Sequence, residues 1–129
     1  MKLDLKELIS KILNTQPKDY IVEKGTSGTW TYRKWNSGIA ECWGVWSSGG
    51  ATGSAVNGWY CRVLGAISFP TNLFISAPKL IPSIYFWDTG YYFIGARDVS
   101  KTSFKLHIMK NGSGNASSNG AVYAIGQWK

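Results

Sequence analysis

Residues 39–46, IAECWGVW, decide the fold class, because Ile39, Glu41, Trp43 and Val45 alternate with Ala40, Cys42, Gly44 and Trp46. Odd and even positions form two separate sets, as the two-residue period of a β-strand requires. Residues 104–109, FKLHIM, repeat the pattern, with Phe104, Leu106 and Ile108 on one side. Other strand-like runs occupy residues 57–69, 83–87, 91–96 and 121–128. Strands of this length, separated by turn residues, predict an all-β fold, which we expect to be an antiparallel, jelly-roll-like β-sandwich.

A short amphipathic helix is predicted before the strands, over Lys2–Asn14. Its apolar stripe contains Leu5, Leu8, Ile9 and Ile12, spaced at helical intervals. The chain should therefore divide into a helical segment, residues 1–16, and a β-sandwich binding domain, residues 17–129. A helix this short is marginal alone in water, so its stripe needs a partner. Two interpretations remain open: packing against its own β domain, or a short coiled coil that joins copies of the chain.

Turn and loop signals separate the predicted strands. Asp88-Thr89-Gly90 predicts a hairpin loop between the strand-like runs at residues 83–87 and 91–96. Residues 47–54 and 111–120 are small and polar, and we expect both to be exposed loops.

Composition and charge limit the classes of function. Hydrophobic residues make up 44% of the 129 positions and the net charge is +7, but the basic residues are spread along the whole chain. Nucleic-acid binding needs positive charge concentrated on one face, so no nucleic-acid partner is expected. We also expect no membrane insertion, since no apolar run reaches 18 residues, and no signal peptide, since Asp4, Lys6 and Glu7 interrupt the N-terminal segment. Cys42 and Cys61 should be small apolar residues, and neither a metal nor a cofactor is expected.

No catalytic constellation is recognisable in the sequence, so we expect a protein that is not an enzyme. Glu41 lies on a predicted strand between aromatic residues, and its ordinary interpretation is an ion pair with Arg33 or Lys34. The one histidine, His107, should be a surface residue.

The aromatic residues indicate binding surfaces. The chain has seven tryptophans, and Trp and Tyr side chains stack on sugar rings and anchor protein interfaces. We take Trp59, Tyr60, Trp87, Tyr91 and Tyr92 as candidate ligand-binding residues. Burial of these aromatics between subunits is the competing interpretation.

Residues 19–44, DYIVEKGTSGTWTYRKWNSGIAECWG, resemble the C-terminal module of phage and prophage tail-fibre and minor structural proteins of gut and other Gram-positive bacteria. Residues 1–13, 65–80 and 121–129 resemble the leading helix, a proline-containing stretch and the terminal strand of that family. The resemblance implies a virion protein of the tail tip or fibre, made in the bacterial cytoplasm and without enzymatic activity. Its implied partners are two further copies in a homotrimer, other tail proteins, and a host cell-surface polysaccharide.

Within that resemblance, the motif residues have an implied structural role: Trp30, Arg33, Trp35, Glu41 and Trp43. The function we expect is therefore a receptor-binding tip domain that attaches to a host glycan. Two alternatives remain: a structural virion cap or fibre module without a ligand, and a cell-wall-degrading hydrolase that would depend on Glu41 or Asp88.

Overall fold

The computed structural model describes residues 4–14, 18–48, 54–85, 91–111 and 118–129 as one helix followed by ten strands. The helix is α1 (Leu5–Asn14), and the strands are β1 (Ile21–Ser27), β2 (Trp30–Trp35), β3 (Ile39–Ser47), β4 (Ser54–Val56), β5 (Trp59–Val63), β6 (Ile67–Ser68), β7 (Lys79–Pro82), β8 (Tyr92–Arg97), β9 (Ser103–Asn111) and β10 (Asn119–Gln127). All pairings between these strands are antiparallel.

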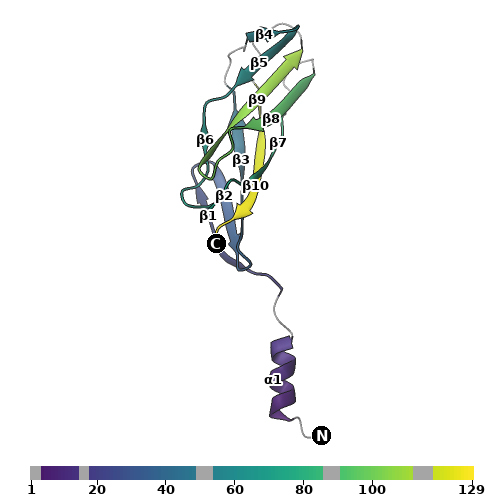
Figure 1. Ribbon diagram of the computed structural model, residues 1–129, viewed down its shortest axis with the longest axis vertical. Coiled ribbons are helices and arrows are strands. Elements are labelled where there is room, and N and C mark those ends of the chain that lie inside the picture. The colour runs from purple at the N-terminus through teal and green to yellow at the C-terminus, as the bar shows by residue number, and fades with distance from the viewer. Residues whose placement is uncertain (1–3, 15–17, 49–53, 86–90, 112–117) are drawn as a thin grey trace.

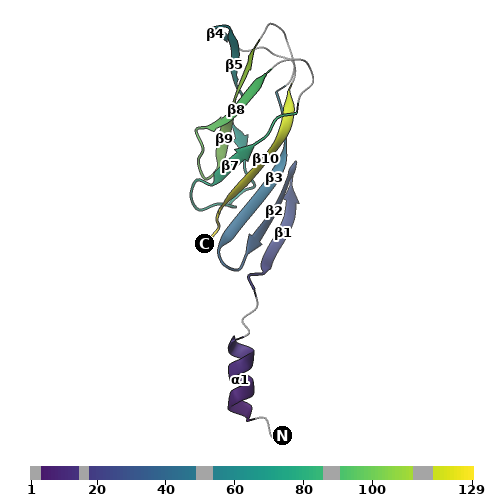
Figure 2. The same ribbon diagram turned by 90° about the vertical axis from the view of Figure 1, so that its right-hand side faces the viewer.

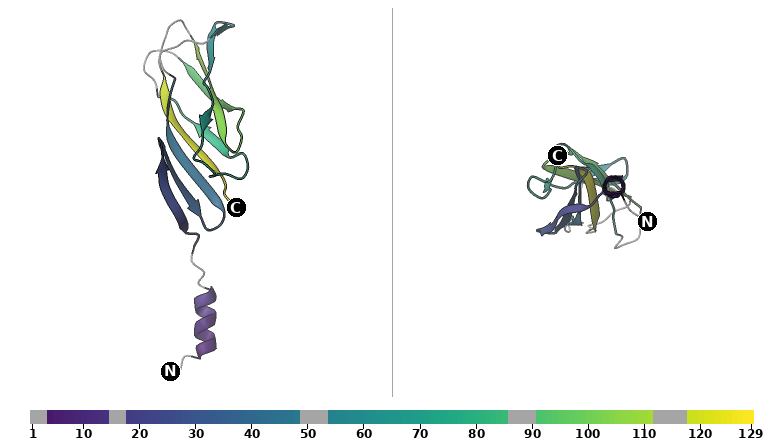
Figure 3. Two further views of the ribbon diagram at one scale, coloured as in Figure 1. Left: turned by 90° about the vertical axis from the view of Figure 1, so that its left-hand side faces the viewer. Right: turned by 90° about the horizontal axis from the view of Figure 1, so that it is seen from below.

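Two sheets pack face to face, which confirms the predicted β-sandwich. The larger sheet has the order β1-β2-β3-β10-β7, and the smaller has β4-β5-β9-β6, with β8 paired along the other edge of β9. The strands of both sheets run roughly along the long axis of the molecule (Figures 1 and 2). Seen along that axis, the two sheets form separate layers (Figure 3).

The core fills the space between the layers. From β9, every second side chain is buried, and Phe104 and Leu106 have no exposed surface at all. The larger sheet contributes the facing residues Ala40, Cys42, Trp46, Val122 and Ala124. The alternation expected for residues 104–109 is thus confirmed, and in residues 39–46 it is broken at Glu41, which is buried although it lies between the inward-facing Ala40 and Cys42.

Several tryptophans hold the strands and their connections together through their indole N–H groups. Trp30 donates to the Ser68 carbonyl oxygen at 2.9 Å, and Trp46 donates to that of Ser83 at 3.0 Å. A buried indole N–H needs an acceptor, so these two hydrogen bonds fix the orientation of the rings in the core.

The chain enters the larger sheet beside the β2–β3 turn. Ser37 donates a backbone hydrogen bond of 2.9 Å to the Asp19 carboxylate, and its hydroxyl donates to the second carboxylate oxygen. Asn36 also donates its backbone N–H to the Tyr20 carbonyl oxygen at 2.9 Å. The start of β1 is therefore tied to the turn before β3.

The prediction of one long strand over residues 57–69 is wrong. Asn57 and Gly58 adopt positive φ angles of 49° and 81°, and they form the two-residue turn of the β4–β5 hairpin. Asn-Gly is the dipeptide that most strongly favours this turn, because both central residues must have positive φ. The remainder of the stretch divides into β5 and the short strand β6.

The hairpin predicted across Asp88-Thr89-Gly90 is also wrong. Tyr85 bridges to Asn119 of β10 in the larger sheet, whereas β8 pairs with β9 in the smaller sheet. The chain therefore crosses between the sheets here, because pairing with distant strands prevails over the local turn signal. Residues 88–90 themselves lie outside the described residues.

The ends of the two predicted loops are less exposed than expected. Ser48 and Ser118 are buried, and Ser48 donates its backbone N–H to the Ser118 carbonyl oxygen at 2.8 Å. In return, Ser118 donates its backbone N–H to the Ser48 hydroxyl at 2.9 Å. The central parts of both loops, residues 49–53 and 112–117, lie outside the described residues.

Candidate functional site

The structure places four of the five predicted ligand-binding residues, and they lie on two different surfaces. Trp59 and Tyr91 lie on the outer face of the smaller sheet, on either side of Asn111. Tyr60 and Tyr92 both pair with Lys110, and they are half-buried on the inner face. Trp87 lies outside the described residues. Two of the five therefore belong to one exposed surface.

Strand register defines that outer face row by row, because directly opposed residues of antiparallel strands share a face. Three rows run from β5 across β9 to β8 or to Tyr91, the residue before it: Trp59–Asn111–Tyr91, Cys61–Met109–Phe93 and Val63–His107–Gly95. A further row pairs Lys105 with Arg97. The aromatic rows lie at the β4–β5 end of the sandwich, opposite the end from which α1 projects (Figures 1 and 2).

Phe93 is the central aromatic residue of this face, although it is absent from the predicted set. Its side chain is 62% exposed, and its ring centroid lies 5.5 Å from that of Trp59. The spacing Tyr91, Phe93, Gly95, Arg97 was available in the sequence as a signal, since residues two apart on a strand share a face.

A shallow hollow of about 200 Å³ lies beside Phe93 on this face. It is lined by Phe93, Ile94, Gly95, His107 and Met109. The hollow exists because Gly95 brings no side chain to a position between Phe93 and Arg97. His107 is half-buried there, which agrees with the surface histidine that the sequence predicts.

Positive charge lies one row beyond the hollow. Arg97 and Lys105 approach the same carboxylate oxygen of Asp98 at 3.5 and 3.6 Å. Two cations that share one carboxylate leave an excess of one positive charge beside His107.

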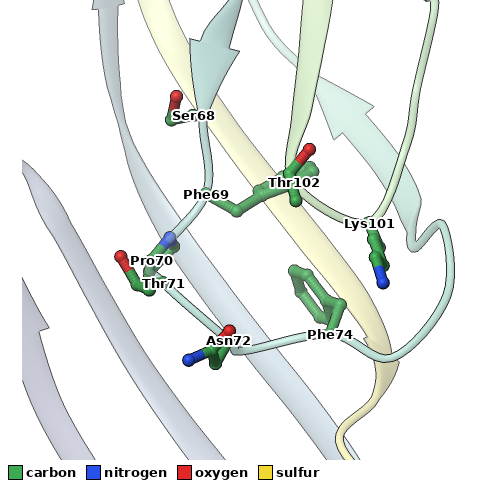
Figure 4. Close-up of a pocket in the computed structure, with 8 residues that line it drawn as sticks. All are labelled: Ser68, Phe69, Pro70, Thr71, Asn72, Phe74, Lys101 and Thr102. Atoms are coloured by element: carbon green, nitrogen blue, oxygen red, sulfur yellow. The ribbon is translucent and has the colours of Figure 1, made fainter.

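Two other hollows have different linings. One of about 250 Å³ lies between residues 68–74 and the turn before β9, with Asn72 and Lys101 on either side of the Phe74 ring (Figure 4). The aromatic rings in it, Phe69 and Phe74, are buried core residues and offer little surface for stacking. Another of about 430 Å³ lies at the edge of the larger sheet's outer face and includes Val45 and Tyr85.

The outer face of the larger sheet carries a polar cluster around Glu41. Arg33 donates to the Glu41 carboxylate from Nε at 2.5 Å, and Trp35 donates its indole N–H to it at 2.7 Å. The Tyr123 hydroxyl donates to the other carboxylate oxygen. The Arg33 guanidinium also lies 5.1 Å from the Trp35 ring centroid and 5.2 Å from that of Trp43. The predicted ion pair of Glu41 with Arg33 is confirmed, while Lys34 pairs with Glu23.

These contacts determine the protonation of the cluster. The hydrogen bond from Arg33, reinforced by those from Tyr123 and Trp35, lowers the pKa of Glu41 from 4.5 to about 2. Burial, together with the adjacent carboxylate, raises the pKa of Tyr123 to about 12. A carboxyl group that is ionised at neutral pH has no proton to give, so Glu41 is unsuited to the general-acid role that a glycosidase requires. Asp88, the other carboxylate considered for a hydrolase, lies outside the described residues.

Apolar side chains surround this cluster on the same outer face. Ile81 and Val45 are each 64% exposed, Trp43 is 37% exposed and Ile39 is 38% exposed. Register places Trp43, Tyr123 and Ile81 in one row across β3, β10 and β7. The face therefore combines exposed apolar side chains with an internally paired polar centre, and Lys24 and Lys79 lie at the two ends of the Glu41 row, on the edge strands β1 and β7.

The helix α1 also exposes its apolar stripe. Leu5, Leu8, Ile9 and Ile12 are between 40% and 68% exposed. Figures 1 and 3 show α1 projecting beyond the sandwich, away from both sheets. Packing of this stripe against the chain's own β domain, one of the two interpretations of the sequence, is not the arrangement in this structure.

The cysteines and the metal-binding residue types offer no further site in the described ranges. Both cysteines are free thiols, and burial raises the pKa of Cys42 to about 12. Within the part of the chain that the structure describes, no three His, Cys, Asp or Glu side chains gather as metal ligands do. Over the same part, no helix has the length and apolarity that a bilayer crossing requires.

No protein-family model and no curated protein sequence matches the chain. Among solved structures, an N-truncated R1-type pyocin tail fibre is similar, with a TM-score of 0.57 and 14% sequence identity. The match covers 98% of this chain and 99% of that one. The chain therefore shares its fold, over nearly its whole length, with a tail fibre fragment.

Proposed function

We propose that this protein is a tail structural protein of a phage or prophage, and that it forms a homotrimeric tip domain that attaches to a host cell-surface glycan. The observation that carries the proposal is the fold likeness to a pyocin tail fibre, which extends over almost the full length of both chains. The motifs at residues 19–44 and 121–129, which resemble tail-fibre modules, support the same role.

Two exposed apolar surfaces support self-association. The helix α1 is too short to be stable alone in water. A coiled coil with neighbouring copies of the chain would bury its apolar side chains Leu5, Leu8, Ile9 and Ile12. The outer face of the larger sheet, with Val45 and Ile81 exposed, offers a second contact area.

The outer face of the smaller sheet supports attachment to a glycan. It exposes Phe93 and Tyr91 at the end of the sandwich opposite α1, as a tip domain carried on a helix requires. Aromatic rings stack on the apolar faces of sugars. Three linked copies would raise the avidity of a weak single site without any new contact. Other tail proteins and the virion tail are then the partners and the location of the chain.

Light scattering after gel filtration tests the assembly. We expect a mass near three times the 14.2 kDa of one chain, and a fall to one chain for Leu8→Asp, which places charge in the helical stripe. Ser10→Asp, which adds the same charge outside the stripe, should remain trimeric. A single-chain mass for the unaltered protein would contradict the proposal.

Adsorption to a panel of Gram-positive cell walls separates attachment from a purely structural role. The full chain should sediment with at least one wall preparation, and Phe93→Ala should not. A trimer that adsorbs to none of the walls would favour a cap or fibre module without a ligand.

A further inference from the structure

Gly95 occupies a strand position where nothing in the fold requires glycine. It lies inside β8, and it pairs with His107 in a regular antiparallel register from Tyr92 to Arg97. A Cβ added at Gly95 would meet no atom within 4 Å, and its φ lies outside the left-handed region. Glycine inside a strand destabilises the fold relative to alanine, because it loses more conformational freedom on folding.

The other strand glycines that the structure describes each have a packing reason. An added Cβ would lie 2.9 Å from the Tyr32 hydroxyl at Gly25, 3.1 Å from the Trp30 ring at Gly44 and 2.9 Å from the Phe74 ring at Gly126. At Gly120 it would clash with the Ser83 carbonyl group at 1.9 Å. Among these strand positions in the described ranges, Gly95 alone faces open space. A glycine inside a strand often marks a bulge, a tight bend or a place where a ligand approaches the strand closely, and at Gly95 the register shows no bulge and the Cβ position is open.

The open space has the lining of a sugar subsite. Phe93 forms one wall with an exposed ring that can stack on the apolar face of a pyranose. His107 lies opposite the glycine, and an imidazole can donate and accept hydrogen bonds with ring hydroxyl groups. A volume of about 200 Å³ is below the roughly 300–1,000 Å³ of pockets for drug-sized ligands, and it suits a single ring.

The positive charge of Arg97 and Lys105 beside the hollow favours sugars that carry an anionic group. Residues two apart on a strand are separated by about 7 Å, so Arg97 follows Gly95 by the distance at which a substituent of the bound ring would reach it. Among the residues that the structure describes, Arg97 and Lys105 share the single carboxylate of Asp98, which leaves one excess positive charge for the ligand to neutralise.

We infer that the hollow over Gly95 binds one pyranose ring of an anionic saccharide, with the ring stacked on Phe93, hydroxyl groups bonded to His107, and the anionic group directed toward Arg97 and Lys105. The inference rests on the proposed function, for which it specifies the binding site and the ligand class. Carboxylate and phosphate substituents would both satisfy the charge, so the test compares the two.

The experiment uses the imidazole NMR signals of the full chain, which need no assignment because His107 is its one histidine. The probes are oligogalacturonate, glucose 1-phosphate and neutral maltotriose, each titrated at constant pH and ionic strength. We expect His107 signals to shift with at least one anionic probe, at an affinity about fivefold higher than with maltotriose, as one partly exposed charge pair allows.

Two valine variants provide the matched comparison. Gly95→Val fills the hollow with a residue that suits a strand, and it should abolish the shifts while leaving the fold intact. Thr26→Val places the same side chain at an exposed position of β1 in the larger sheet, and it should bind like the unaltered protein. Dispersed amide spectra of both variants show whether they are folded.

Each result decides the inference. Unmoved His107 signals with both anionic probes, equal affinity for maltotriose, or unchanged binding by Gly95→Val would each overturn it. A lower mass of Gly95→Val in light scattering would also overturn it, because the hollow would then be a contact between copies of the chain. A trimer without shifts would leave the proposed assembly standing and remove this site, whereas a single chain with shifts would do the opposite.

Discussion

The outer faces of the two sheets carry the same residue types but differ in how their polar groups are paired. On the larger sheet, Glu41 receives hydrogen bonds from Arg33, Trp35 and Tyr123, so the polar centre is satisfied within the chain. On the smaller sheet, an exposed aromatic ring stands beside an empty glycine position, and two cations share one carboxylate.

This difference distinguishes a surface suited to protein contact from one suited to a polar ligand. The centre of the larger sheet's face has its charges already paired, and Lys24 and Lys79 lie on its edge strands, so this centre can be covered without leaving a buried charge unsatisfied. A face with excess charge gains when an oppositely charged ligand arrives. Both faces arise from the alternation of side chains along the strands. They differ in whether their charged groups are paired across neighbouring strands.

The largest expected effect comes from placing a charge on the larger sheet's face. Ile81→Asp would bury three carboxylates in a trimer, at an effective cost of several kcal/mol per ion, or more than about 6 kcal/mol in total. We expect light scattering to show one chain in place of three. Ile75→Asp, at a residue 55% exposed in the connection between β6 and β7, should remain trimeric. The reverse outcome would place the interface elsewhere.

Removing the charge at the centre of that face should destabilise each chain. Glu41→Gln leaves Arg33 without its carboxylate, and we expect the free energy of unfolding in urea to fall by about 2–3 kcal/mol. Glu23→Gln, which breaks the more exposed pair with Lys34, should cost less than about 1 kcal/mol. Equal losses in the two variants would show that the Glu41 cluster has no special structural role.

The lowered pKa of Glu41 also determines how the free energy of unfolding should depend on pH. The folded pKa of Glu41 is about 2 and its ordinary value is 4.5, so its contribution is complete above about pH 5 and is lost as pH falls through 2. We expect a contribution on the order of 2 kcal/mol, allowing for the solvent around Arg33. Urea unfolding between pH 2 and pH 6 should show this slope in the unaltered protein and a flatter one in Glu41→Gln.

The smallest effect is expected on the smaller sheet. Arg97→Gln should weaken the binding of an anionic saccharide by about two- to fivefold, the value of one partly exposed charge, with less effect at high salt. Lys24→Gln makes the same change of net charge on the larger sheet and should leave binding unaltered. If the two variants weaken binding equally, overall charge and not the position of Arg97 is responsible.

The core strands were predictable because their signal is local. The alternation around Leu106 and the apolar stripe around Leu8 each depend on residues within one element. The β4–β5 hairpin could also have been predicted, because Asn57-Gly58 is a strong turn signal. The apolar residues that follow Gly58 led instead to the prediction of one long strand.

The candidate site was only partly predictable because its faces are set by distant partners. Alternation in residues 91–97 requires two sets of side chains, but the sequence does not say which set faces the core. Pairing of β8 with β9 decides this, since Ile94 lies opposite the buried Ile108 and Phe93 opposite Met109. Tyr92 therefore turns inward and Phe93 outward, although both are aromatic.

The tie between Asp19 and Ser37 has a mechanical consequence. In the proposed tip, a pull between virion and host would run from α1 through the start of β1 to the far end of the sandwich, parallel to the strands (Figure 1). The six register pairs of β1 with β2 cross that direction, so the pull would shear their hydrogen bonds together instead of peeling them one after another. Strands loaded in shear resist unfolding, so in the proposed tip the contact with the host would yield before the sandwich unfolds.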